Sequence, residues 1–100
     1  MNRFFDELGE RWTTAAERRS AHIEAPRLDA KVALELLELA RAAAHTQERR
    51  FAPLSCYMAG VAAERLRAAK GRIDEADVAA YILEVRLELE KETPAEPNDR

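Results

Sequence analysis

Apolar residues recur at intervals of three and four along most of the chain, with charged residues between them. This spacing is the period of an α-helix, and no stretch alternates strictly as a half-buried strand does. The pattern predicts four helices, over residues 2–19, 28–45, 53–70 and 75–91. We therefore expect an all-α protein with a single four-helix domain over residues 1–92, arranged as an antiparallel helical bundle. The remaining residues, 93–100, are polar and proline-rich and predict a disordered tail.

Residues with known preferences at helix ends support these boundaries. Pro53 suits the first turn of the third helix, where its missing amide hydrogen is not needed. Gly71 suits the end of the same helix, because glycine readily adopts the left-handed conformation found there. Asp74 and Asp77, three positions apart, predict a capping box at the start of the fourth helix. Gly9 lies inside the first helix, where it costs about 1 kcal/mol relative to alanine, so we expect it to mark a close contact.

The helical period also predicts the core. In the second helix it selects Leu36 and Leu37 together with several alanines. In the third helix it selects a stripe of larger apolar residues: Leu54, Tyr57, Met58, Val61, Ala62 and Leu66. Small residues lie beside that stripe at Cys56, Gly60 and Ala63, where we expect another backbone to approach closely. The large side chains of the second and third helices are thus predicted to pack against each other.

The fourth helix carries two apolar stripes on different faces. The first consists of Val78, Ile82, Val85 and Leu89, and the second of Ala76, Ala80, Leu83 and Leu87. A terminal helix buries two faces only if it lies between two neighbours. We therefore expect the second stripe to be an interface, covered either by the first helix or by another chain, which is a protein partner or a second copy in a homodimer. The mass of the protein in solution separates these alternatives.

Composition and charge narrow the class of protein. Hydrophobic residues make up 47% of the chain and charged residues 35%, which is typical of a folded domain with a heavily charged surface. The net charge of −3 gives no general reason to expect nucleic acid or an anionic membrane as partner. No apolar run is long enough to span a membrane, and the N-terminus lacks the pattern of a signal peptide. We expect a soluble cytoplasmic protein.

The chain offers few residues for catalysis or metal binding. No acid, base and nucleophile are spaced as a recognisable catalytic set, so we expect no enzymatic activity. Cys56 is the only cysteine, and we interpret it as a buried, inert thiol. His22 and His45 are too far apart in sequence to form a metal motif. We therefore expect neither a metal nor another cofactor.

The corner between the second and third helices is the strongest candidate for a ligand site. Arg49 and Arg50 directly precede a helix start, where free amides and a partial positive charge suit an anion. Their guanidinium groups can hold a phosphate or carboxylate with two hydrogen bonds. With Ser55 and His45 they form a hypothetical site for an anionic cofactor or nucleotide. In the alternative interpretation, the arginines pair with neighbouring glutamates and His45 caps the end of a helix.

A second basic cluster ends the third helix: Arg65, Arg67, Lys70 and Arg72. Cations are favoured at this end of a helix by its dipole. No aromatic residues are interleaved with them to stack on bases. We therefore do not expect nucleic-acid binding.

The stretch "LELARAAAHTQERRFAPLSCYMAGVAAER", residues 37–65, resembles a small bacterial family of helical domains. The positions that match its pattern are Arg41, His45, Ala52, Pro53, Leu54 and Gly60. Its members occur alone or fused to molybdenum-cofactor guanylyltransferases, and some are associated with molybdopterin-guanine dinucleotide biosynthesis. The resemblance implies a non-enzymatic accessory or protein-interaction domain, with such a guanylyltransferase as one candidate partner. It assigns no role to any residue. A domain that binds a small anionic ligand at the corner is the alternative function.

A weaker likeness concerns the end of the chain. The segment "RAAKGRIDEADVAAYI" is similar to the end of a histone fold, where a loop containing glycine precedes a capped last helix. That arrangement requires a long central helix running through Pro53, which disfavours it.

Overall fold

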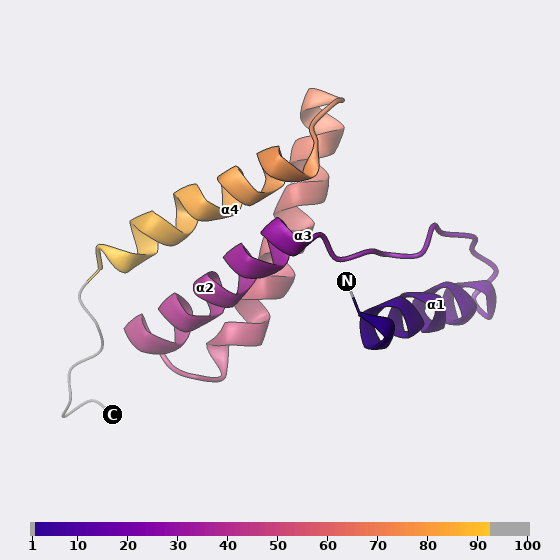
Figure 1. Cartoon of the computed structure of the whole chain (residues 1–100), viewed down its shortest axis with the longest axis horizontal. Helices are drawn as coiled ribbons and strands as arrows, with labels where there is room; N and C mark the ends of the chain where they lie inside the picture. The colour runs from indigo at the N-terminus through magenta and orange to yellow at the C-terminus, as the bar shows by residue number, and fades with distance from the viewer. Residues whose placement is uncertain (1, 93–100) are drawn as a thin grey trace. The chain divides into compact units, whose positions relative to one another are not determined.

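The computed structural model describes residues 2–92 (Figure 1). The helices are α1 (Arg3–Glu17), α2 (Ala30–Thr46), α3 (Phe51–Lys70) and α4 (Glu75–Glu90). No strand occurs among the described residues, so the all-α class is confirmed. The boundaries differ from the predicted ones by at most two residues, and the predicted tail at 93–100 lies outside the described residues.

The contacts divide the chain into two compact units, one ending at Ala30 and the other beginning at Lys31. The first unit holds α1 and the connector that follows it, and the second holds α2, α3 and α4. Each unit has its own internal packing. The expectation of one four-helix domain over residues 1–92 stays a prediction.

In the first unit, the connector folds back against α1. The helix begins at an Asn2 cap, whose side-chain oxygen accepts a hydrogen bond from the amide of Phe5 at 3.2 Å. A Cβ atom placed on the buried Gly9 would lie 2.7 Å from the carbonyl oxygen of Pro26. The close contact predicted at Gly9 is therefore confirmed, and its neighbour is the backbone of the connector.

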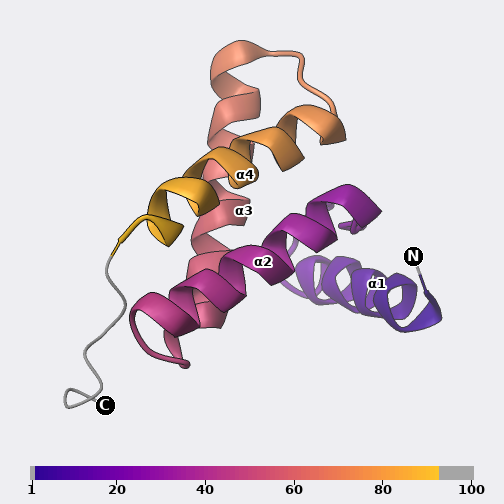
Figure 2. The ribbon, with the colours of Figure 1, turned by 60° about the vertical axis from the view of Figure 1, so that its left-hand side comes forward.

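In the second unit, α2 and α4 both cross the same side of α3, and two views 60° apart agree on this (Figures 1 and 2). Leu39 from α2, Ala63 from α3, and Val78 with Ile82 from α4 form the buried cluster. Partly buried apolar residues surround it: Val32, Leu36, Ala59, Ile73 and Leu89. The core is small, and α3 contributes only the single methyl group of Ala63 to the buried cluster.

One part of the predicted core is wrong. Leu37 on α2 and Met58 on α3 are 67% and 71% exposed, and Leu54 and Tyr57 are exposed as well. The α3 face toward α2 and α4 instead carries small residues, because small side chains let a neighbouring helix approach more closely. On α2, burial falls on Leu39, two positions and about 200° of helical rotation away from Leu37.

Only some of the small residues on α3 meet a neighbouring helix as predicted. Ala63 is buried, and the thiol of Cys56 donates a hydrogen bond to the carbonyl oxygen of Leu36 on α2, with 3.6 Å between the two atoms. Gly60, in contrast, is exposed, and a Cβ placed on it would meet nothing within 4 Å. The expectation of a close backbone approach at Gly60 is therefore wrong.

The corner between α2 and α3 has the predicted form. The last residue of α2, Thr46, is buried and its hydroxyl donates to the carbonyl oxygen of Ala42 at 2.8 Å. After a short turn, α3 begins at Phe51 with Pro53 in its first turn. This break excludes the long central helix that a histone fold requires.

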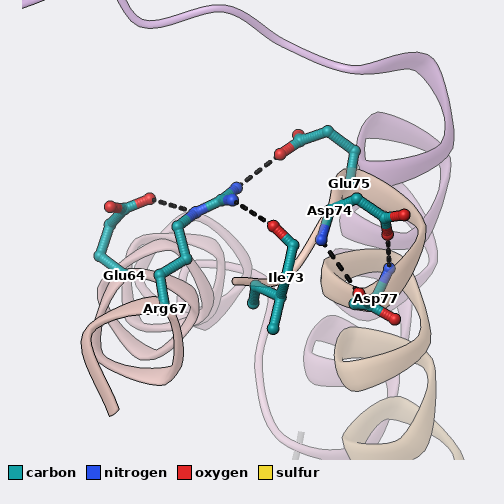
Figure 3. Close-up of polar contacts among 6 residues, drawn as sticks. All are labelled: Glu64, Arg67, Ile73, Asp74, Glu75 and Asp77. Carbon is teal, nitrogen blue, oxygen red and sulfur yellow. Dashed lines mark hydrogen bonds and ion pairs between the residues drawn. The ribbon is translucent and has the colours of Figure 1, made fainter. Parts of the chain in front are cut away.

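The start of α4 contains the predicted capping box (Figure 3). The Asp74 carboxylate accepts from the amide of Asp77 at 2.9 Å, and the Asp77 carboxylate accepts from the amide of Asp74 at 3.0 Å. The hydrogen bond from the amide of Asp77 is the main cause that lowers the pKa of Asp74. At the preceding helix end, Gly71 has the positive φ of +86° that its position demands.

Arg67 ties the end of α3 to the start of α4 (Figure 3). Its guanidinium group contacts the carboxylate of Glu64 at 3.1 Å and that of Glu75 at 2.5 Å. It also donates to the carbonyl oxygen of Ile73 at 3.4 Å. The hydrogen bond to Glu75, followed by that to Glu64, raises the pKa of Arg67. One member of the predicted basic cluster therefore has a structural role.

A second ion pair joins α2 to α4 and was not predicted. The Arg86 guanidinium lies 3.1 Å from the carboxylate of Glu35, and these two side chains are only 16% and 17% exposed. Arg86 also pairs with Glu90 at 3.1 Å, one turn along α4. The hydrogen bonds to Glu35 and Glu90 raise the pKa of Arg86. This pair is a direct, largely buried contact between α2 and α4.

Candidate interaction surface

A groove of about 260 Å³ lies between α3 and α4, and one side chain of α2, that of Leu39, also lines it. It is lined by Leu39, Ser55, Met58, Ala59, Ala62, Tyr81, Ile82, Val85 and Leu89. No charged side chain lines it, and the Ser55 hydroxyl donates to the carbonyl oxygen of Phe51 at 2.9 Å. The groove therefore suits an apolar side chain better than an anion or a metal ion.

The apolar surface continues from the groove along the outer side of α3. A shallower hollow shares Met58 and Tyr81 with the groove and adds Tyr57, Val61 and Arg65. Leu54 lies one helical turn before Met58 and is also exposed. We call this surface the α3–α4 face, made of Leu54, Tyr57, Met58, Val61, Tyr81 and Val85.

The α3–α4 face exposes large side chains that normally pack inside proteins. Met58 is 71% exposed and Val85, across the groove on α4, is 49% exposed. Tyr57 and Leu54 extend this exposure along α3. Scattered apolar residues are common on protein surfaces, but residues that line one groove form a contiguous patch, which marks interaction sites.

Charged residues of opposite sign lie at the two ends of the α3–α4 face. Arg65 shares a hollow with Tyr81, at one end. Glu84 and Glu88 are exposed on α4. Glu84 lies three positions after Tyr81, and Glu88 lies three positions after Val85. Glu88 therefore lies toward the other end of the face. Within residues 2–92, none of these three charged side chains has an ion-pair partner.

The second stripe of α4 lies apart from this face. Ala76, Ala80 and Leu87 are exposed, and Leu83 is partly buried. None of the four lines the groove between α3 and α4. The structure thus leaves this stripe largely uncovered, and its assignment as an interface stays a prediction.

Two residues of the hypothetical anion site make other contacts in the structure. Arg50 pairs with Glu48, as the alternative interpretation predicted, and Ser55 lines the apolar groove. The side chains of His45 and Arg49 are exposed and have no hydrogen-bond or ion-pair partner in the described part of the chain.

At the start of α3, the first three positions offer no free amide hydrogen to an anion. The amide of Phe51 donates to the carbonyl oxygen of Glu48 at 3.0 Å, and that of Ala52 donates to Arg49 at 3.1 Å. Pro53, the third residue of the helix, has no amide hydrogen. The corner therefore lends no support to anion binding by residues 45–55, which stays a prediction.

Cys56 is half-buried against α2, and burial raises the pKa of its thiol. It therefore keeps its proton at neutral pH, which agrees with the interpretation of an inert thiol. Among the described residues, no three or more metal-ligating side chains gather into a group. Nor does any helix in residues 2–92 have the length and apolar character needed to cross a membrane.

Comparisons with known proteins connect the chain to one family. The model of a domain of unknown function, DUF6457, matches residues 6–96. No curated protein and no solved structure matches the chain.

Proposed function

Since the chain belongs to this family of domains of unknown function, we propose its function from its surface. The chain is a non-enzymatic protein-interaction domain, and the α3–α4 face is where a partner docks. The partner supplies apolar side chains that fill the groove between the two helices.

The observation that carries this proposal is the exposure of Met58 and Val85 on the two sides of an uncharged groove. Burying one large apolar side chain stabilises a complex by about 1.5–3 kcal/mol before the costs of association. Tyr57 adds an aromatic side chain of the kind that is enriched in protein interfaces. Large apolar anchors beside a groove are the usual carriers of binding energy.

Site-specific photo-cross-linking in cells tests the proposal. A photoreactive amino acid at position 58 is expected to give a discrete covalent adduct with a protein, because the partner lies directly over this side chain. Gln47, exposed in the turn between α2 and α3, is the control position and is expected to give none. Adding Val85→Glu to the chain that carries the probe at position 58 is expected to abolish the adduct, because a carboxylate then lies at the edge of the groove.

Three results would contradict the proposal. The first is no adduct at position 58, and the second is an adduct of equal yield at position 47. The third is a link within the same chain, detected by peptide mapping, which would mean that the groove is filled by the chain itself.

The same adduct identifies the partner. The resemblance of residues 37–65 to domains fused to molybdenum-cofactor guanylyltransferases makes such an enzyme one candidate for an accessory role. Peptides from a guanylyltransferase in the adduct would support that role, and their absence would contradict it. This link rests on the resemblance alone.

A further inference from the structure

We infer that the partner on the α3–α4 face is the same face of a second copy of this chain, packed about a two-fold axis. The inference rests on the proposed function, because it takes the docking face as given and names its occupant.

The distribution of charge along the face is the first argument. The centre, around Met58 and Val85, is apolar. One end carries the unpaired cation Arg65, and the unpaired anion Glu88 lies toward the other end. A two-fold axis that passes through the centre, perpendicular to the line joining the two ends, reverses the direction of the second copy, so its acidic end meets the basic end of the first. Arg65 of each copy then faces Glu88 of the other, and the contact is made twice.

The symmetry also accounts for the apolar centre. On a two-fold axis, residues near the centre contact their own equivalents. Met58 and Val85 near the axis therefore pack against the Met58 and Val85 of the second copy, and the two grooves are identical. Methionine suits this position because its flexible side chain adapts to an irregular apolar surface.

The charges disfavour other occupants. An anionic membrane would attract Arg65, but Glu84 and Glu88 on the same face would be repelled. A strongly basic or acidic partner would satisfy one end of the face and be opposed at the other. A second copy satisfies both ends with one surface.

Charge reversal with compensation tests the inference on the purified full-length chain. We expect Arg65→Glu to place like charges at both contacts of the homodimer and to raise its dissociation constant about tenfold, as two exposed pairs change from attraction to repulsion. Glu84→Arg with Glu88→Arg is expected to act in the same way. A mixture of the two variants is expected to form a heterodimer of wild-type affinity, because each of its contacts again joins opposite charges. Sedimentation equilibrium measures all three constants.

Two matched variants test the location of the interface. Leu37→Glu places a carboxylate at an equally exposed leucine of α2, outside the α3–α4 face, and is expected to leave the dissociation constant unchanged. Leu83→Glu with Leu87→Glu alters the second stripe of α4 and is expected to do the same. Circular dichroism on each variant confirms that the helices remain.

The inference is overturned if the wild-type chain is a monomer at high micromolar concentration, or if mixing fails to restore association. It is also overturned if the variants at Leu83 and Leu87, rather than those at Arg65 and Glu88, dissociate the dimer. Its failure is distinct from that of the proposed function. A cross-linked adduct at position 58 with a different protein supports a docking face and excludes the second copy as its occupant.

Discussion

Gly9 and Gly60 both lie inside helices, but only Gly9 has a close neighbour. At Gly9 an added methyl group would meet a backbone carbonyl, which cannot move aside as a flexible side chain can. At Gly60 the space is open, so only the helix propensity of the residue changes. The two positions therefore separate a packing effect from a propensity effect.

We expect Gly60→Ala to increase the free energy of unfolding by about 1 kcal/mol, because alanine has the higher helix propensity. Gly9→Ala is expected to weaken the contact between α1 and the connector despite the same gain in propensity. Urea unfolding measures the first effect, and hydrogen exchange of the α1 amides, which should become faster, measures the second. Slower exchange in Gly9→Ala would show that the connector does not lie against Gly9.

The thiol of Cys56 reports on the contact between α2 and α3. Burial raises its pKa, so the folded chain binds this proton more tightly than the unfolded chain does. The resulting stabilisation is complete below the pKa of the unfolded thiol and is lost as pH rises through the pKa of the folded one. We expect alkylation of the native chain by iodoacetamide to begin at higher pH than alkylation of the urea-unfolded chain. Mass spectrometry across a pH series measures both, and coincident profiles would contradict the burial of this thiol.

Local chemistry at single residues was predictable from the sequence. The capping box of Asp74 and Asp77 and the end of α3 at Gly71 depend on neighbours within a few positions, which the sequence displays directly. The pairing of Glu35 with Arg86 spans 51 positions and was not predictable. Both residues occur in charged stretches of ordinary appearance, and only the crossing of α2 and α4 brings them together.

At the scale of the helix, the sequence predicted where α2 and α3 lie along the chain but not which side of each faces inward. Both helices carry apolar residues around much of their circumference, so the helical period alone does not select one face. The large residues of α3 formed the more obvious stripe, yet the small ones face the neighbouring helices. Size therefore decides the packing, and the sequence alone does not reveal the α3–α4 face because the helical period places most of its residues in the core.

A pair of alanine substitutions on α2 tests which side of this helix faces the core. Leu39→Ala is expected to lower the free energy of unfolding by about 2–5 kcal/mol, because it removes a buried side chain and leaves a cavity. Leu37→Ala removes the same atoms from an exposed position, and we expect a change below about 1 kcal/mol. Urea unfolding measures both. A larger loss of stability for Leu37→Ala than for Leu39→Ala would show that Leu37 lies in the core, as the sequence predicts.

The ion pair between α2 and α4 gives a further prediction. Arg86→Met leaves the Glu35 carboxylate poorly solvated and without its partner, and we expect a clear fall in the melting temperature. Arg86→Met combined with Glu35→Leu leaves no such charge, and we expect the melting temperature to recover most of the loss. Calorimetry on the two variants measures the difference. A double variant less stable than the single one would show that the pair stabilises the fold beyond balancing its own charges.

At the scale of the whole molecule, the sequence predicts the all-α class and the four helices, because the helical spacing of apolar residues and the helix-favouring composition extend over most of the chain. The division into two compact units was not predicted, because it depends on contacts between distant segments. The three-helix unit has a core of a few side chains and exposes others of similar size. A unit of this kind gains stability when another surface covers those side chains, which couples its folding to association.

The contacts that Arg67 makes between the end of α3 and the start of α4 suggest an order in which the three-helix unit folds. Its acceptors all lie within eight positions of it in sequence, so closing this loop costs little chain entropy. The Glu35–Arg86 pair, in contrast, closes a loop of more than fifty residues. Because contacts of low sequence separation form earlier on average, we expect the start of α4 to dock on the end of α3 before the Glu35–Arg86 pair forms.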